Sequence, residues 1–239
     1  MTLLTICTDA ADELNSVRPV AVVGNNMPDV LKLLRYANRV GSDLALRGTW
    51  QAMRVAVPFV AIAGEEQPGV VPDVSVRIIP ESFWEVGQRK LVSGPVPSAQ
   101  WQSLEVANIP GAYRWWTQRG NALLLFPAPT GGETFRFEYR SRAYCESAAA
   151  VAQTRWLADT DVGRFSEELF TLGIIAHVAE GEGLAFAGAA RVDFERRFAR
   201  EAASDMPRDR ILAAGDVFKG PRHSTGEPAP DGGVFGWRY

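Results

Sequence analysis

The chain has 239 residues, more than one compact domain usually needs and fewer than two large domains contain. Its hydrophobic fraction of 46% and charged fraction of 22% are ordinary for a soluble globular protein. The formal net charge is −3, from 25 basic and 28 acidic residues. This balance argues against a protein whose main task is to grip nucleic acid or an anionic membrane surface.

Cysteine and histidine are scarce. The two cysteines, Cys7 and Cys145, are too few for a disulfide framework, and two histidines are too few for a histidine-rich metal site. No stretch approaches the roughly 20 apolar residues of a membrane span, and the first residues lack the basic region of a signal peptide. We therefore expect buried free thiols, no cofactor, no metal ion and no membrane contact.

The first fifty residues have the apolar period of amphipathic helices. One helix is predicted from Leu3 to about Leu14. A second is predicted to start near Pro28, a residue favoured in the first turn, and to stop at Gly48.

Residues 51–164 have a different character, because nine of the fifteen prolines lie between Pro58 and Pro129. In the range 134–139, Phe135, Phe137 and Tyr139 share one face of a strand. Hairpin turns are predicted at 119–121 and 130–132, and a short helix near 98–106. The strands of this antiparallel module are predicted at 53–62, 74–79, 112–117, 122–126 and 134–139.

Two more helices are predicted between 165 and 205. The first follows Ser166 as its N-cap, carries an apolar stripe and breaks at residues 181–183. The second covers about 184–203. Residues 206–239 contain four prolines, six glycines and few apolar side chains, which predicts an extended or disordered arm.

These segments together predict an α+β fold. The helices of 1–50 and 165–205 would form a four-helix bundle that is split by an antiparallel β insert at 51–164. An extended C-terminal arm at 206–239 completes the expected layout.

Several short motifs occur in a characteristic order over residues 2–205. They are LLTICTDAADEL at 3–14, LRYANRVG at 34–41, GTWQA at 48–52, SGPVPSAQWQ at 93–102, LFPAPT at 125–130, FEY at 137–139, ADTDV at 158–162 and EEL at 167–169. In this order they resemble the head–tail adaptor proteins of short-tailed bacteriophages, also called head-completion or connector proteins. The arm resembles the corresponding part of that family only in its general character and not in specific motifs.

The resemblance implies a structural, non-enzymatic virion protein at the head–tail interface, made in the host cytoplasm. It implies a ring, commonly of twelve copies, that docks beneath the portal protein and carries tail nozzle, hub or fibre proteins below. Double-stranded DNA would pass through the ring without specific binding. The arm would reach the portal or a neighbouring subunit, where aromatic side chains can fill partner pockets. The arm residues predicted for this contact are Phe218, Phe235, Trp237, Arg238 and Tyr239.

Two other surfaces are candidates for contacts. The last helix carries arginines interleaved with acidic residues, which predicts a solvated or inter-subunit face rather than a DNA contact. The neighbouring Trp115 and Trp116 would place one ring on each face of a strand. One ring belongs to the core, and the other either contacts a tail protein or packs within the module. The arginines of the helical face are Arg191, Arg196, Arg197 and Arg200.

The alternative function is a virion-associated cell-wall glycosidase. Such an enzyme needs two carboxyl groups at a set separation, and Glu138 with Glu167 or Glu168 could supply them. Glu138 is expected on the polar face of a strand, and Glu167 and Glu168 at the start of a helix. These positions favour a structural role for the three acids. A carbohydrate-binding β module is a third reading. His177 and Glu180 lie one helical turn apart without a visible third ligand, so we expect a surface or capping role for His177.

Overall fold

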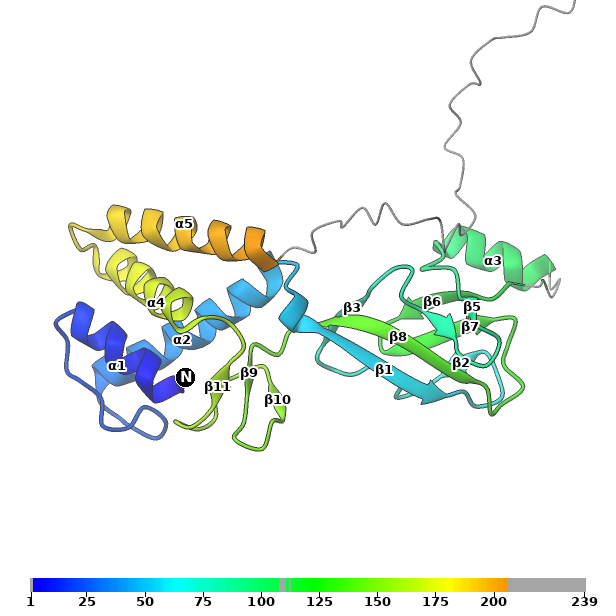
Figure 1. The fold of residues 1–239 in the computed structure, drawn as a ribbon, viewed down its shortest axis with the longest axis horizontal. Helices are drawn as coiled ribbons and strands as arrows, with labels where there is room; N and C mark the ends of the chain where they lie inside the picture. Colours follow the sequence, from blue (N-terminus) through cyan, green and yellow to red (C-terminus); the bar gives the residue numbers. More distant parts are fainter. Residues whose placement is uncertain (1, 108–110, 112, 206–239) are drawn as a thin grey trace, which may run out of the picture. The chain divides into compact units, whose positions relative to one another are not determined.

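The computed structural model in Figure 1 describes residues 2–107, 111 and 113–205. The chain divides into two units, residues 1–206 and 207–239, and the described residues belong to the first. They form five α-helices and antiparallel sheets, which confirms the predicted α+β class.

The first two helices lie where the sequence predicts them. Helix α1 spans Leu3–Glu13, and a reciprocal capping box between Thr2 and Thr5 closes its first turn. Helix α2 spans Pro28–Arg47, with proline in its first turn. The C-cap is Gly48, whose N–H donates to the carbonyl of Leu44.

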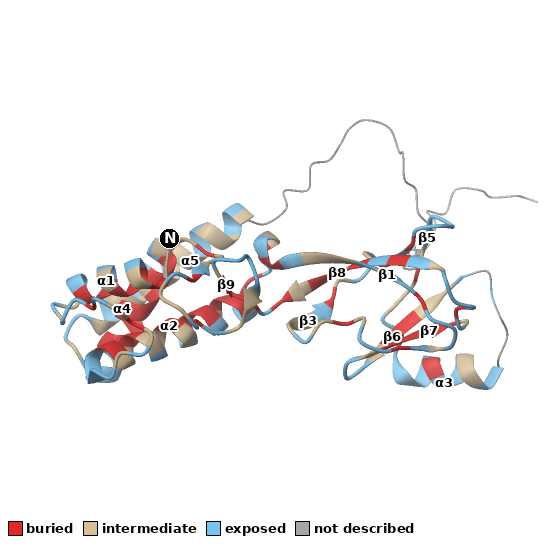
Figure 2. Ribbon diagram, turned by 90° about the horizontal axis from the view of Figure 1, so that it is seen from below, coloured by how far each residue is buried: buried red, intermediate tan, exposed pale blue. Residues whose placement is uncertain are grey.

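Helix α4 (Glu167–Glu182) begins after Ser166, whose hydroxyl accepts a hydrogen bond from the N–H of Leu169, as predicted. It ends at Gly183, which adopts the left-handed conformation with φ of 66°. The expected single apolar stripe is wrong, because α4 is buried almost all round by α1, α2 and α5 (Figure 2). Helix α5 (Ala187–Asp205) starts about three residues later than predicted.

A segment between the sheets and α4 joins the helical core. It contains the short strands β9 (Cys145–Glu146), β10 (Ala152–Gln153) and β11 (Val162–Gly163). The Tyr144 hydroxyl and the Trp156 N–H both donate to the side-chain oxygen of Asn38 on α2, at 2.7 and 3.1 Å. The predicted bounds of the β insert, 51–164, include this segment. In the structure its buried aromatic side chains pack among the helices instead.

Two larger sheets share a second core. In the first, β8 (Thr134–Ser141) pairs with β1 (Arg54–Val60), β3 (Ser75–Ile78) and β4 (Trp84–Glu85), and β4 pairs with β5 (Lys90–Leu91). The second has the order β2 (Glu66–Gln67), β7 (Ala122–Phe126), β6 (Trp115–Arg119). The core between them contains the predicted buried face Phe135, Phe137 and Tyr139.

Helix α3 (Ser98–Ala107) covers the other face of the β6–β7 pair (Figure 1). Its Trp101 is fully buried beside Leu124 and Phe126, which alternate along β7 with the residues of the second core. Short 3₁₀ helix η1 (Gln51–Met53) links α2 to β1.

One of the two predicted hairpins is present. Residues Arg119 and Ala122 pair across a tight turn in which Gly120 has φ of 59°, a conformation that favours glycine. The hairpin predicted at 130–132 is wrong, because β7 and β8 belong to different sheets. The loop instead crosses between the sheets, and the carboxylate of Glu133 accepts hydrogen bonds from its N–H groups.

Candidate interaction surfaces

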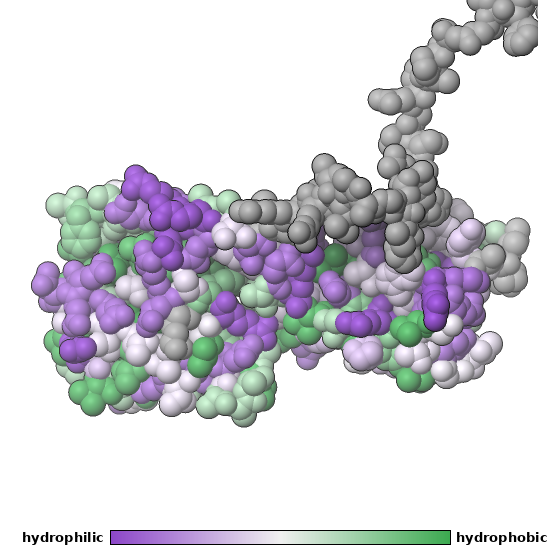
Figure 3. Space-filling view, in the orientation of Figure 1, coloured by the Kyte–Doolittle hydropathy of each residue, from purple (hydrophilic) through white to green (hydrophobic). Residues whose placement is uncertain are grey.

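The arginines of α5 are largely neutralised within the chain. Hydrophilic side chains gather over this helix in Figure 3. Arg200 is exposed and has no ion pair among the described residues. The pairs of the other three are Arg191 with Glu195 at 3.0 Å and Glu180 at 3.8 Å, Arg196 with Asp193 at 3.1 Å, and Arg197 with Glu168 at 2.8 Å and Glu201 at 2.6 Å.

A further arginine, which the sequence pattern did not single out, joins α2 to α5. The guanidinium of Arg47 bonds to both carboxylate oxygens of Glu195, at 3.0 and 2.5 Å, and lies 4.3 Å from the ring centroid of Phe198. This bond holds the pKa of Glu195 below its ordinary value. No local signal could reveal the pair, because the two residues are 148 positions apart.

Carboxylates line a groove of about 560 Å³ between α1 and α4. Glu167 and Glu168 lie in the first turn of α4, where negative charge interacts favourably with the helix dipole. We call this surface the acidic groove; its acidic residues are Asp9, Asp12, Glu13, Glu167 and Glu168.

The carboxyl pair required by the glycosidase alternative is not assembled. Glu138 lies on β8, where it pairs with Ala56 of β1, and it does not line the acidic groove. None of the cavities found among the described residues is lined by Glu138 together with Glu167 or Glu168. The geometry therefore offers no support for paired acid–base chemistry.

The two adjacent tryptophans point to opposite sides of β6, as predicted. Trp116 is 2% exposed and packs in the core against Phe83, with ring centroids 5.8 Å apart. Trp115 is half-buried and packs against the cluster under α3. Only Trp115 of the pair thus retains surface for a partner. The exposed tryptophan of the sheets is Trp84, at 41% exposure, which the sequence did not mark.

The outer face of β8 carries a row of arginines. Because Phe135, Phe137 and Tyr139 point into the core, alternate residues of β8 point outward. The strand register adds one arginine from β1 and one from β3, both directly opposite Arg140. We call this surface the arginine face; its arginines are Arg54, Arg77, Arg136, Arg140 and Arg142. Sequence alternation places Arg136 and Glu138 outside, but it cannot show which strands lie beside them.

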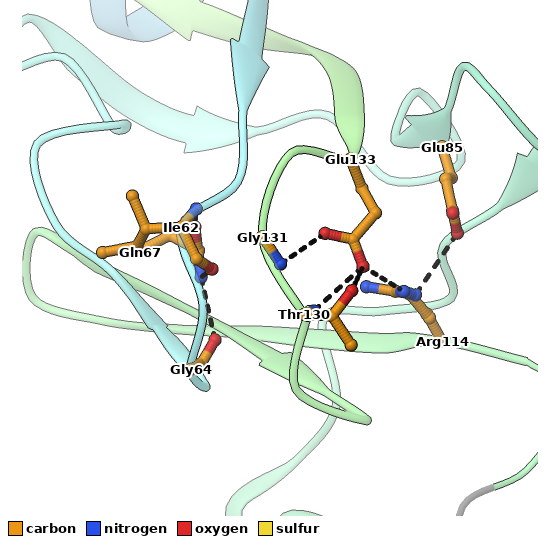
Figure 4. Close-up of polar contacts among 8 residues, drawn as sticks. All are labelled: Ile62, Gly64, Gln67, Glu85, Arg114, Thr130, Gly131 and Glu133. Atoms are coloured by element: carbon orange, nitrogen blue, oxygen red, sulfur yellow. Dashed lines mark hydrogen bonds and ion pairs between the residues drawn. The ribbon is translucent and has the colours of Figure 1, made fainter.

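A partly buried charge cluster holds the loops of the β part together (Figure 4). Arg114 lies between two carboxylates, with Nε 3.3 Å from Glu85 and Nη2 3.1 Å from Glu133. Glu133 also accepts bonds from the N–H groups of Thr130 at 3.0 Å and Gly131 at 2.8 Å. The bond from Thr130 is the main reason that the pKa of Glu133 falls to about 2, and Arg114 adds to the effect.

A second polar contact in Figure 4 closes the loop before β2. Gln67 is 1% exposed, and its side chain bonds to the backbone of this loop. Its oxygen accepts from the N–H of Ile62 at 2.9 Å, and its amide nitrogen donates to the carbonyls of Ile62 and Gly64. Together with the Arg114 cluster, this contact orders the loops at the ends of the two sheets.

The expected surface or capping role of His177 is wrong. His177 is buried on α4 and stacks on the Tyr36 ring, with centroids 6.1 Å apart. Burial, together with the charges of Arg39 and Arg191, lowers its pKa, because the charged imidazolium is disfavoured there. The pattern failed here because the face of α4 that carries His177 is covered by α2 rather than by solvent.

Both thiols are buried, as predicted. Burial raises the pKa of Cys7 and of Cys145 to about 12, with smaller contributions from neighbouring carboxylates. In the part of the chain that the structure describes, no group of three or more histidine, cysteine or acidic residues could hold a metal ion. No helix there is long and apolar enough to cross a membrane.

The residues predicted for the arm contact lie outside the described residues; they are Phe218, Phe235, Trp237, Arg238 and Tyr239. Their role stays a prediction from the sequence.

Comparison with known proteins gives one assignment. The model of the SU10 adaptor protein family matches residues 1–221. No curated protein matches the chain. The family match covers all the helices and sheets described above and extends past residue 205. The chain therefore belongs to the SU10 adaptor protein family, the phage adaptor proteins that have a structural role in the virion.

Proposed function

We propose that the protein is a ring-forming head–tail adaptor that docks beneath the portal protein and carries tail proteins below it. Twelve copies is the number that the resemblance to connector proteins implies. The observation that carries this proposal is the adaptor-family match over residues 1–221, since it includes the helices, both sheets and the first residues after 205.

In this proposal the helices form a four-helix bundle that builds the ring and lines the DNA exit channel. The support is the position of α4, which is buried by α1, α2 and α5 and makes the helical part a rigid block. The Arg47–Glu195 bond ties α2 to α5 across its surface. A rigid block can present fixed faces to two neighbours, as a closed ring requires.

In this proposal the helices that line the channel would not bind the passing DNA tightly. DNA binding is driven largely by release of counterions when protein cations neutralise phosphates. Three of the four α5 arginines already face carboxylates, and the whole chain has a net charge of −3. Double-stranded DNA would therefore pass beside the helices without specific binding.

The arm beyond residue 205 would bind the portal or a neighbouring copy. Its support is compositional: Phe235, Trp237 and Tyr239 end a segment that is otherwise poor in apolar residues. Aromatic side chains dominate the binding energy of many interfaces because they bury large areas in partner pockets. Trp115, the half-buried member of its pair, stays the candidate contact for a tail protein on the β part.

The test uses the full chain with alanine at Phe235, Trp237 and Tyr239, mixed with the portal protein and sedimented. We expect the variant to stay in the supernatant while the parent chain co-sediments with the portal. A control variant with Phe235→Tyr, Trp237→Phe and Tyr239→Phe keeps the aromatic rings and should co-sediment. Equal co-sedimentation of the alanine variant would refute the role of the arm, and no portal binding by the parent chain would refute the adaptor function.

A further inference from the structure

The arginine face is the strongest unbalanced charge among the described residues. Arg54 of β1 and Arg77 of β3 both lie directly opposite Arg140 of β8, so three arginines form one row across three strands. Arg136 lies on β8 at an outward position, and Arg142 directly follows the last residue of this strand. Glu138 is the single carboxylate of β8 on this face.

None of the five arginines has an ion pair within 4.0 Å among the described residues, although thirteen pairs of a lysine or arginine with a carboxylate occur elsewhere in this region. Their polar contacts are instead with backbone carbonyls. Arg140 donates to the carbonyls of Leu46 and Gly48 at 3.4 Å, and Arg142 donates to that of Asp73 at 2.9 Å.

Like charges directly opposite each other destabilise a sheet. Burial and the charge of Arg77 lower the pKa of Arg140, which reflects this repulsion. The isolated protomer therefore bears an electrostatic cost that a binding anion would remove. The face is broad and exposed, with Arg54, Arg77, Arg136 and Arg142 all open to solvent, so the anion must be a surface rather than a small molecule in a pocket.

The chain itself carries a surface of the opposite charge. The acidic groove brings five carboxylates together between α1 and α4. Asp9, Glu13 and Glu167 have no ion pair among the described residues, and Asp12 has only Arg18 at 3.8 Å. Because α5 neutralises most of its own arginines, the arginine face is the cationic surface that best matches this groove.

We propose that the arginine face of one copy binds the acidic groove of the next copy in the ring. The inference rests on the proposed ring and names the two surfaces that make its contacts. Two different patches on one chain allow a head-to-tail contact, which closes into a ring when the rotation per subunit fits.

The size of the face indicates what this contact contributes. From Arg136 on β8 to Arg142, just after the strand ends, it extends roughly 20 Å, and three strands give a width of roughly 10 Å. That is well below the roughly 800 Å² per partner of a stable interface. Electrostatic complementarity of this kind sets orientation and association rate more than affinity. The contact would therefore select the correct neighbour and would be sensitive to salt.

Cysteine cross-linking tests the contact directly. Cys7 and Cys145 are buried, so the parent chain should not react with maleimides. Arg77→Cys and Glu13→Cys each place a thiol at an exposed position, one on each surface. The variants are mixed with the portal protein and treated with a short bismaleimide. We expect a cross-linked dimer from the mixture, none from either variant alone, and a ladder of oligomers from the double variant.

The matched control is Arg35→Cys, which places a thiol at an exposed position of α2 outside both surfaces; its mixture with Glu13→Cys should give no cross-link. Mass photometry of the same samples distinguishes failure of the proposed ring from failure of the proposed contact. If no oligomer forms on the portal, the proposed ring is wrong. If an oligomer forms and position 77 does not cross-link to position 13, only the present inference is overturned.

Charge exchange gives a second test in chains without added cysteine. Arg54→Glu with Arg77→Glu should raise the concentration needed for half-assembly by about tenfold at low salt. Adding Asp9→Arg and Glu13→Arg should restore assembly, while Arg35→Glu with Arg39→Glu, at exposed positions of α2 outside both surfaces, should leave it unchanged. Normal assembly of the Arg54/Arg77 variant would overturn the proposal. So would a variant that assembles normally and loses retention on duplex DNA, since the face would then contact nucleic acid.

Discussion

Replacement of Arg114 by leucine should destabilise the β part strongly, because it leaves a buried carboxylate without its cation. Glu85 is 3% exposed, and its ion-pair partner among the described residues is Arg114 at 3.3 Å. Glu133, by contrast, keeps its bonds from Thr130 and Gly131 when the arginine is lost. The cost therefore falls mainly on Glu85.

Removal of one partner from a buried ion pair typically costs about 3–5 kcal/mol. The same principle states that replacing both partners by apolar groups is often neutral. Glu85→Leu combined with Arg114→Leu should therefore recover most of the lost free energy of unfolding. The recovery would not be complete, because the guanidinium also lies 5.4 Å from the ring centroid of Phe135 and bonds to Glu133.

The assay is urea unfolding followed by tryptophan fluorescence, with the parent chain, the two single variants and the double variant. At neutral pH we expect a loss of about 3–5 kcal/mol for Arg114→Leu and a much smaller loss for the double variant. A penalty below about 1 kcal/mol, or a double variant as unstable as Arg114→Leu, would refute the reasoning.

Three further outcomes are expected. The pKa of Glu133 is about 2 in the folded chain against 4.5 for the free group, so its stabilisation is complete above about pH 4.5 and is lost as the pH falls toward 2; Glu133→Gln should flatten this part of a stability–pH curve. Gln67→Leu leaves the N–H of Ile62 without its buried partner and should cost about 1–3 kcal/mol in chemical denaturation, with Gln67→Glu as a less damaging comparison at low pH. Cys7 and Cys145, whose pKa values burial raises to about 12, should react with a thiol reagent only after unfolding; rapid modification of the native chain would contradict their burial.

Local signals determined where most elements lie. The ends of α2 and α4 follow from Pro28, Gly48, Ser166 and Gly183, because capping and backbone conformation depend on neighbouring residues alone. The alternation around Phe135 identified the inner face of β8 for the same reason.

Signals that depend on distant residues were not available from the sequence. The loop at 130–132 has the composition of a hairpin, yet it links two sheets. Its backbone N–H groups donate to the Glu133 carboxylate, which Arg114 also contacts. His177 resembles a surface residue until α2 covers it. The motif order, by contrast, pointed to the adaptor family without any knowledge of packing.

The candidate surfaces likewise differ in whether local sequence could predict them. Helical spacing of three and four residues already paired the α5 arginines with acids, so their neutralisation could be predicted. The arginine face could not, because Arg54, Arg77 and Arg140 are brought together only by strand register across nearly ninety residues. The sequence by itself determined the class of fold, most helix ends and the family. Only the tertiary structure decided which charges remain unpaired, since charge balance depends on neighbours in space rather than along the chain.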